Sequence, residues 1–401
     1  MRLISSYPPL AETKDGWQFA APQGEALIRY HVDLEGIAQR GRRFDTALRV
    51  GHSLIAPAST FLLEPEPLEV GVPIALTVKV PKGEDFTAGL TPSGDAGERR
   101  FELQAHEMGV ATYAIFGHFR RVKWSVAGGQ LEVVTADGAL DSSVEQTAHW
   151  VAQSAHAVAR FYGRFPASHC LVLLIPVPER DQVLFGKVLP QSSPGVAVLV
   201  GQRATEPALY QDWILVHELF HIGFPSFHDE AKWLDEGSAT YFEPIIRARA
   251  GYLSELAVWT EFARDMPQGL HAIEHEGLEH PSEFRAIYWG GAIACLLADV
   301  AARQRSRGAL GLEDGFRAVL AAGGNASEVW SLARVTAVID RALGAPILAE
   351  IVAKYAQSGS AVGLAALFEE LGVKRLESGA VLLDDQAPLA SIRRQIVFGR
   401  D

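Results

Sequence analysis

Two histidines and a glutamate occur within nine residues of the chain, in the run Trp213-Ile-Leu-Val-His217-Glu218-Leu-Phe-His221. Residues four apart lie on one face of an α-helix, so both imidazoles can reach one metal ion while Glu218 stands beside it. We expect this helix to begin near Thr205, which can cap its first turn. A zinc ion held in this way activates water, and Glu218 is then the expected general base. The pattern predicts a zinc hydrolase.

A coincidental match is the first alternative, because the chain contains 13 histidines. The residues around the motif argue against coincidence, since they are apolar: Trp213, Ile214, Leu215, Val216, Leu219 and Phe220. They would place two imidazoles and a carboxylate in or against a core, and burying those groups without partners costs on the order of several kcal/mol. A bound metal removes that cost.

Several groups compete to be the third metal ligand. His228 would suit a metzincin, but that pattern requires glycine and histidine three and six residues after the last helix histidine, where this chain has phenylalanine. Asp229 and Glu230 stand in a polar loop, where we expect them to be solvated. Glu236 stands on a predicted helix that can pack beside the first, and it is the best choice. The expected ligands of one Zn²⁺ per chain are therefore His217, His221 and Glu236.

The elements that must position these residues fall into three stretches, which together predict an α+β multidomain fold. Residues 1–138 alternate apolar and polar positions between Pro and Gly, which predicts an antiparallel β domain. Residues 139–304 are expected to form an α/β catalytic domain, with buried strands at Cys170–Pro176 and Gly195–Gly201. Residues 305–401 are rich in Ala and Leu and divided by glycines, so we expect a C-terminal helical region packed against that domain.

Composition and charge exclude several classes of protein. The formal net charge of −12 leaves no basic footprint for nucleic acid or anionic lipid. No apolar run reaches the roughly 18–20 residues of a membrane span. The first residues lack the continuous apolar stretch of a secretory signal, so the chain as printed is expected to be cytoplasmic. A signal trimmed from it would instead make the protein periplasmic or secreted.

Three motifs, in the same order, resemble those of the gluzincin metallopeptidases, in particular the aminopeptidase N and glycyl aminopeptidase families. They are His-Glu-Leu-Phe-His at 217–221, Trp-Leu-Asp-Glu-Gly-Ser-Ala-Thr-Tyr at 233–241 and Tyr-Trp-Gly-Gly-Ala at 288–292. The resemblance covers roughly residues 140–305 and implies a thermolysin-like catalytic domain, a zinc metallopeptidase activity and a peptide substrate. It also implies that Tyr288 is catalytic and hydrogen-bonds the oxyanion of the tetrahedral intermediate.

One departure from these families leaves the mode of cleavage open. Aminopeptidases of this group bind the free amine of the substrate with a glutamate, which stands on a Gly-rich strand ahead of the metal helix. The matching stretch here, Ser192–Gly201, contains no carboxylate. Alternatives to an aminopeptidase are therefore an endopeptidase, an enzyme that uses another acidic group, or a non-catalytic peptide-binding protein on a retained peptidase fold.

A second histidine motif stands at His271-Ala-Ile-Glu-His275, with His280 shortly after it. It matches the inverted zinc motif H-x-x-E-H. Its neighbours Pro267, Gly269 and Gly277 are typical of loops, and the apolar helix that surrounds the first motif is missing. We therefore favour a loop that faces solvent or substrate, with a second metal site as the alternative.

Overall fold

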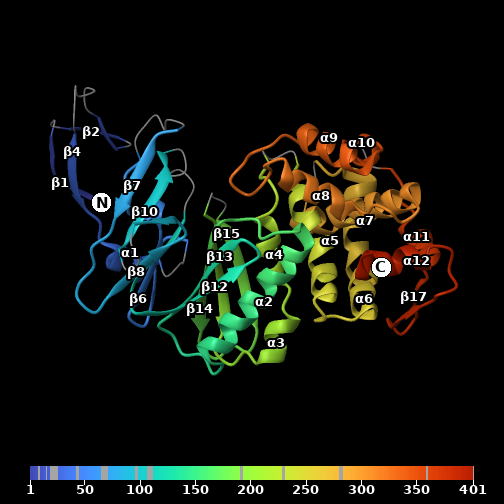
Figure 1. The fold of residues 1–401 in the computed structure, drawn as a ribbon, viewed down its shortest axis with the longest axis horizontal. Coiled ribbons are helices and arrows are strands. Elements are labelled where there is room, and N and C mark those ends of the chain that lie inside the picture. Colours follow the sequence, from blue (N-terminus) through green and yellow to red (C-terminus); the bar gives the residue numbers. More distant parts are fainter. Residues whose placement is uncertain are drawn as a thin grey trace. The chain divides into compact units, whose positions relative to one another are not determined.

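The chain divides into two compact units, which we describe separately (Figure 1). The computed structural model describes residues 1–7, 10–14, 16–18, 26–41, 45–64, 71–94, 98–105, 112–189, 193–227, 231–279, 283–357 and 360–400. The first unit comprises Met1–Ala88 and Pro92–Phe119, and the second comprises Gly89–Thr91 and Arg120–Asp401. Within the described ranges, every helix is too short or too polar to cross a membrane.

The first unit consists mainly of short antiparallel strands. A four-stranded sheet has the order β5-β6-β11-β8, a three-stranded sheet has the order β7-β10-β9, and β1-β4 and β2-β3 form two-stranded pairs. The expected N-terminal antiparallel sheets are thus confirmed. The elements are β1 (Arg2–Tyr7), β2 (Ala11–Thr13), β3 (Gly16–Gln18), β4 (Leu27–His31), α1 (Leu34–Gly41), β5 (Leu48–Val50), β6 (Ser53–Pro57), η1 (Ala58–Thr60), β7 (Pro73–Thr77), β8 (Asp85–Ala88), β9 (Thr91–Ser93), β10 (Arg100–Gln104) and β11 (Tyr113–Gly117).

A five-stranded mixed sheet opens the second unit, in the order β12-β13-β14-β16-β15. Strands β13, β14 and β16 run parallel, and β15 closes one edge antiparallel to β16. The observed boundary at Phe119 differs from the expected boundary at 138, because β12 and β13 pair into this sheet. The strands are β12 (Phe119–Val126), β13 (Gly129–Ala136), β14 (His169–Val177), β15 (Val183–Leu189) and β16 (Gly195–Gly201).

Helices make up most of the remainder of the second unit. Those before residue 307 are α2 (Val144–Tyr162), α3 (Glu206–Gln211), α4 (Ile214–His221), α5 (Lys232–Arg249), α6 (Glu255–Asp265), η4 (Met266–Gly269), η5 (Ala272–Glu276) and α7 (Phe284–Ser306). The expected single helix from Thr205 is two helices, because Asp212 has extended backbone and its carboxylate accepts a hydrogen bond from the Leu215 N–H at 3.1 Å. A side chain that bonds the backbone in this way starts a new helix.

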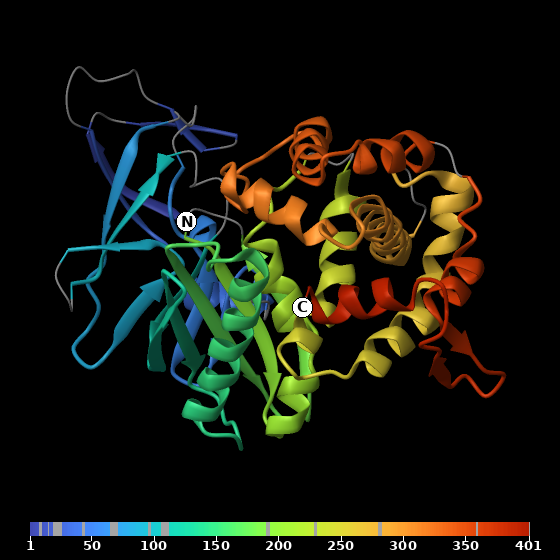
Figure 2. The ribbon, with the colours of Figure 1, turned by 45° about the vertical axis from the view of Figure 1, so that its right-hand side comes forward.

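The C-terminal region is helical, as expected, and it packs on the helices that carry the motifs. It contains α8 (Leu312–Ala321), α9 (Leu332–Leu343), α10 (Ile347–Tyr355), α11 (Leu364–Leu371), β17 (Val373–Arg375), β18 (Val381–Leu383) and α12 (Ala390–Phe398). In Figure 2 its orange and red segments lie beside the yellow helices α5 to α7.

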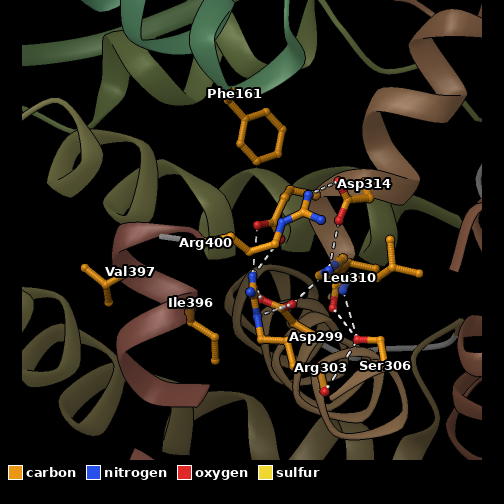
Figure 3. A network of polar contacts seen from close by, with 12 residues as sticks. Phe161, Asp299, Arg303, Ser306, Leu310, Asp314, Ile396, Val397 and Arg400 are labelled. Atoms are coloured by element: carbon orange, nitrogen blue, oxygen red, sulfur yellow. Dashed lines mark hydrogen bonds and ion pairs between the residues drawn. The ribbon is translucent and has the colours of Figure 1, made fainter. Parts of the chain in front are cut away.

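A buried ionic network joins α5, α7 and α8, and Figure 3 labels two of its members, Asp299 and Arg303. Arg303 is fully buried, with its Nε 3.0 Å from Asp299 and its Nη2 2.7 Å from Glu313. The Tyr241 hydroxyl of α5 donates to Asp299 at 2.8 Å, and the Leu312 N–H donates to the same carboxylate at 2.9 Å. Separating α8 from α5 and α7 would leave these buried charges unpaired, which is costly. The cluster therefore holds the C-terminal region against α5.

Helices α5 and α7 cross at direct backbone contact. A Cβ atom built on Gly291 would lie 1.9 Å from the Trp233 carbonyl oxygen, and one built on Gly237 would lie 2.3 Å from the Gly291 Cα. Only glycine fits at this crossing. Glu236 precedes Gly237 on α5 and Tyr288 stands one turn before Gly291 on α7, so the crossing determines how closely these two side chains approach.

We predict that Gly291→Ala lowers the free energy of unfolding by about 1–3 kcal/mol or more, because its new methyl group forces α5 and α7 apart. Gly290→Ala is the matched control. The nearest atom to its new methyl is the end of the Leu278 side chain at 3.2 Å, and alanine favours a helix over glycine by about 1 kcal/mol. Thermal and denaturant unfolding of both variants measures the difference. Equal stability of the two variants would contradict the crossing described above.

Candidate metal centre and its cavity

Three side chains from α4 and α5 converge on one point. The Glu236 Oε2 atom lies 3.3 Å from the His217 Nε2 atom and 3.6 Å from the His221 Nε2 atom. One ligand atom of each residue lies within 4.8 Å of the other two. In the part of the chain that the structure describes, this is the only group of His, Cys, Asp and Glu with such an arrangement.

The spacing of these atoms suits a zinc ion. Ligands at 2.0–2.2 Å from a tetrahedral zinc lie roughly 3.3–3.6 Å from one another. The two separations from Glu236, 3.3 and 3.6 Å, fall in that range. Two imidazoles and one carboxylate are also a donor set found in catalytic zinc sites, which keep a further position for water.

The charges around the centre favour a cation between the three side chains. Burial raises the pKa of Glu236, but hydrogen bonds with His217 and His221 outweigh it and hold the pKa well below its ordinary value. Burial lowers the pKa of His221, but the Asp235 and Glu236 carboxylates raise it well above its ordinary value. A positive charge is therefore stabilised at this point, whether a proton or a metal ion supplies it.

Asp235 fixes the orientation of one ligand. Its Oδ1 atom accepts a hydrogen bond from the His221 Nδ1 atom at 2.9 Å. The proton on Nδ1 leaves a lone pair on Nε2, the nitrogen that faces Glu236. A carboxylate behind a metal-binding histidine is a common arrangement, which makes the histidine a better ligand.

Strand β15 positions Glu218. Its Val188 N–H donates to the Glu218 Oε2 atom at 2.8 Å. A Cβ atom on Gly186 of the same strand would lie 2.8 Å from the Glu218 Cγ atom, so the absence of a side chain at Gly186 lets β15 approach α4. The hydrogen bond ties one carboxylate oxygen to the strand and leaves the other without a main-chain partner from β15.

Tyr288 of α7 lies over the first ligand. Its ring is stacked on the His217 ring, with centroids 6.0 Å apart and an angle of 16° between the planes. Burial and the Glu236 carboxylate raise the pKa of Tyr288 far above its usual range. The hydroxyl is therefore protonated near neutral pH and can donate a hydrogen bond. The structure thus brings together all five residues predicted from the sequence.

His217, Glu218 and Tyr288 line one cavity with a volume of about 690 Å³. Its walls come from β15, α3 to α7 and the turn after α6. The remaining lining residues are Leu184, Phe185, Gly186, Gln211, Trp213, Ile214, Thr240, Glu243, Arg247, Glu261, Arg264, Asp265, Gln268 and Trp289.

A charged cluster, which the sequence analysis did not single out, lies in and behind this cavity. We define it as Asp212, Glu243, Arg247 and Glu261. Glu243 accepts a hydrogen bond from Arg247 at 2.8 Å, and Arg247 also donates to the Gln211 carbonyl oxygen at 2.8 Å. Burial raises the pKa of all three acids, that of Asp212 to about 6. The available sequence signal was the helical spacing of Glu236, Thr240, Glu243 and Arg247 on one face of α5.

The structure describes some of the other candidate ligands and not others. His228, Asp229, Glu230 and His280 lie outside the described residues. His271 is 72% exposed, and its Nδ1 atom lies 3.0 Å from Glu276. Glu274 accepts a hydrogen bond from the Val362 N–H at 2.8 Å. Within the described residues, the H-x-x-E-H motif thus forms no second metal-ligating group.

The stretch 192–201, which we compared with the Gly-rich strand of aminopeptidases, does not form the edge strand beside the metal helix. The described part of the stretch 192–201 contains β16, an interior strand between β14 and β15. The edge strand next to α4 is β15, which precedes it in the chain. Its only charged residue is Lys187, so β15 also offers no carboxylate to a substrate amine.

Comparisons with known proteins establish the fold. No protein-family model and no curated protein matches the chain. Among solved structures, the chain is similar to an aminopeptidase N family protein from Idiomarina loihiensis, with a TM-score of 0.70, 15% identity, and coverage of 91% of this chain and 68% of that one. An M1 zinc metallopeptidase from Deinococcus radiodurans is similar at a TM-score of 0.44 and 16% identity, over 70% of this chain and 62% of that one.

The similarity to the Idiomarina protein defines the class of fold. This chain has a gluzincin aminopeptidase-like fold, in which N-terminal antiparallel sheets are followed by a mixed sheet and a C-terminal helical region. The chain thus shares its fold with an aminopeptidase N family protein.

We predict that the change in the free energy of unfolding caused by Asp212→Asn is more favourable at pH 8 than at pH 4 by roughly 2–3 kcal/mol. The folded chain holds the Asp212 proton up to about pH 6, whereas its ordinary pKa is 3.8. Stability therefore falls as the pH rises through this window, and a neutral Asn, which can still cap α4, removes the loss. Unfolding of both proteins across the window measures the effect, and parallel pH curves would contradict it.

Proposed function

We propose that this chain is a zinc metallopeptidase that hydrolyses peptide bonds in a thermolysin-like catalytic domain within its second compact unit. The main support is the convergence of His217, His221 and Glu236 on one point, beside a cavity that His217, Glu218 and Tyr288 line. The peptidase fold is a second, independent support. His217, His221 and Glu236 would hold one Zn²⁺, which when bound polarises the scissile carbonyl and lowers the pKa of water to about 7.

Glu218 is the proposed general base and acid. Because the Val188 N–H holds its Oε2 atom, the Oε1 atom is the one that takes the proton from the attacking water. The same carboxyl group then gives that proton to the leaving amine. The hydrogen bond from β15 keeps the carboxylate in place through both transfers.

Tyr288 is the proposed donor to the developing oxyanion. Its raised pKa keeps the hydroxyl protonated, and stacking on His217 orients the ring toward the centre. Removing one such donor costs roughly 3–4 kcal/mol of transition-state stabilisation in other enzymes. A non-catalytic peptide-binding protein would need neither this donor nor Glu218, so the geometry favours an enzyme.

The proposed substrate is a peptide that lies along the edge strand β15. Extended chains add to such edges through main-chain hydrogen bonds. Because β15 carries no carboxylate, a free substrate amine has no acidic partner on this strand. The proposal therefore includes both aminopeptidase-like and internal cleavage.

We predict that Glu218→Gln retains zinc and lowers peptide hydrolysis by about 10²–10⁴-fold, because the amide cannot take a proton from water. Wild type and variant are incubated with a mixed peptide library, and cleavage is followed by mass spectrometry. The cut positions separate amino-terminal from internal attack.

Glu206→Gln serves as the control, since Glu206 is exposed on the neighbouring helix α3 and the change alters the net charge equally. It should cleave as wild type does. Cleavage that survives Glu218→Gln, or a wild type that cleaves no peptide with zinc bound, would overturn the proposed function.

A further inference from the structure

The cavity extends well beyond the reacting groups. Helix α5 carries Glu236, Thr240 and Glu243 on one face, and the last two line the cavity. At about 1.5 Å per residue, Glu243 lies roughly 10 Å along the helix from the metal ligand Glu236. A carboxylate wall therefore stands about one long side chain away from the metal centre.

This wall has fewer positive than negative side chains, since Arg247 and Arg264 stand against Glu243, Glu261 and Asp265. Glu243 is paired with Arg247 at 2.8 Å, and Asp265 is paired with Arg264 at 2.5 Å. Glu261 also lines the cavity, where its carboxyl group hydrogen-bonds Glu243 and lies within electrostatic reach of Arg247 and Arg264, whose closest carboxylates are Glu243 and Asp265. Asp212, Glu243 and Glu261 all interact with the same guanidinium of Arg247.

The pKa shifts of the acids agree with this shortage of positive charge in the wall. Burial raises the pKa of Glu261, and Arg247, Arg264 and a hydrogen bond with Glu243 only partly offset that effect. Burial also raises the pKa of Glu243, and the neighbouring Glu261 raises it further. A buried acid with a raised pKa is one whose negative charge is not compensated. An additional cation in the cavity would compensate it.

The geometry of the wall suits an organic cation better than a metal ion. Within the described residues, these acids do not form a metal-ligating group, since only the centre at Glu236 does. The route from that centre to the wall is also apolar in part. Phe185 and Trp213, which are 45% and 47% exposed, and the half-buried Leu184 and Trp289 line it. A group with an apolar stem and a cationic end suits such a cavity.

We propose that this cavity binds a lysine or arginine side chain of the peptide substrate, at a residue beside the scissile bond. Glu261 is the specificity-determining carboxylate, and the Glu243–Arg247 pair holds it in an acidic environment. The apolar walls contact the methylene stem of the side chain. The inference rests on the proposed function and names the substrate class of the same site. The volume of about 690 Å³ is far larger than a lone ammonium group needs, which favours a whole side chain.

Binding to the zinc-loaded Glu218→Gln protein tests this directly, because it does not depend on turnover. The probes are N-acetylated alanine-based peptides in which one lysine, or one uncharged norleucine, is moved one position at a time. Calorimetry measures the dissociation constants. We expect lysine to bind about tenfold or more tighter than norleucine at one position. The added change Glu261→Gln should remove that preference, whereas Glu206→Gln should preserve it.

Two further measurements keep the outcome decisive. The first is the melting temperature of Glu261→Gln, which should not fall, because the substitution neutralises an acid with a raised pKa. The second uses Glu261→Asp if Glu261→Gln fails to fold. This change retracts the carboxylate and should weaken the preference for lysine over norleucine. Equal binding of lysine and norleucine at every position would overturn the inference. So would a preference that Glu261→Gln leaves intact, or one that appears only when the peptide has a free amino terminus.

Failure of this inference is distinguishable from failure of the proposed function. Wild-type cleavage of peptides with no preference for lysine or arginine would overturn the inference alone. Selective binding of lysine peptides without cleavage by the wild type would overturn the proposed function alone.

Discussion

The attraction between the Glu236 carboxylate and the two imidazoles of α4 is the interaction on which the rest of the site depends. It requires α4 and α5 to pack so that a residue on each reaches the same point. The crossing of α5 and α7 at Gly237 and Gly291 places Tyr288 at that point as well. Behind α5, the hydrogen bond from Tyr241 links the helix to the buried charges that anchor the C-terminal region. The C-terminal helices thus support the helix that carries the third ligand.

Part of the site could be predicted from the sequence because His217, Glu218 and His221 lie within five residues of one helix. The spacing of His217 and His221 already places two imidazoles on one helix face. Glu236 and Tyr288 come from separate helices, but Glu236 stands next to Gly237 and Tyr288 stands one turn before Gly291, the two glycines at which the helices cross. In the sequence, Gly237 and Gly291 are only two positions of the motifs. In the structure, they form the contact between α5 and α7.

What the sequence did not reveal depends on contacts between distant segments. The split of the metal helix at Asp212 results from a side chain that bonds the main chain, where local spacing suggested one helix. Strands β12 and β13 alternate like those before them, and only their pairing with β14 assigns them to the second unit. The cluster around Arg247 draws its members from α5, α6 and the connection between α3 and α4, so no single stretch of sequence contains it.

The central claim is that His217, His221 and Glu236 hold one zinc ion, and the zinc content of the purified protein tests it most directly. The protein is loaded with zinc at neutral pH, dialysed, and measured by elemental analysis and X-ray absorption. The account predicts about one zinc per chain, bound by two imidazole nitrogens and one carboxylate, and its loss in His217→Ala. A folded wild type that retains no zinc, or a His217→Ala protein that retains it with unchanged ligands, would contradict the account.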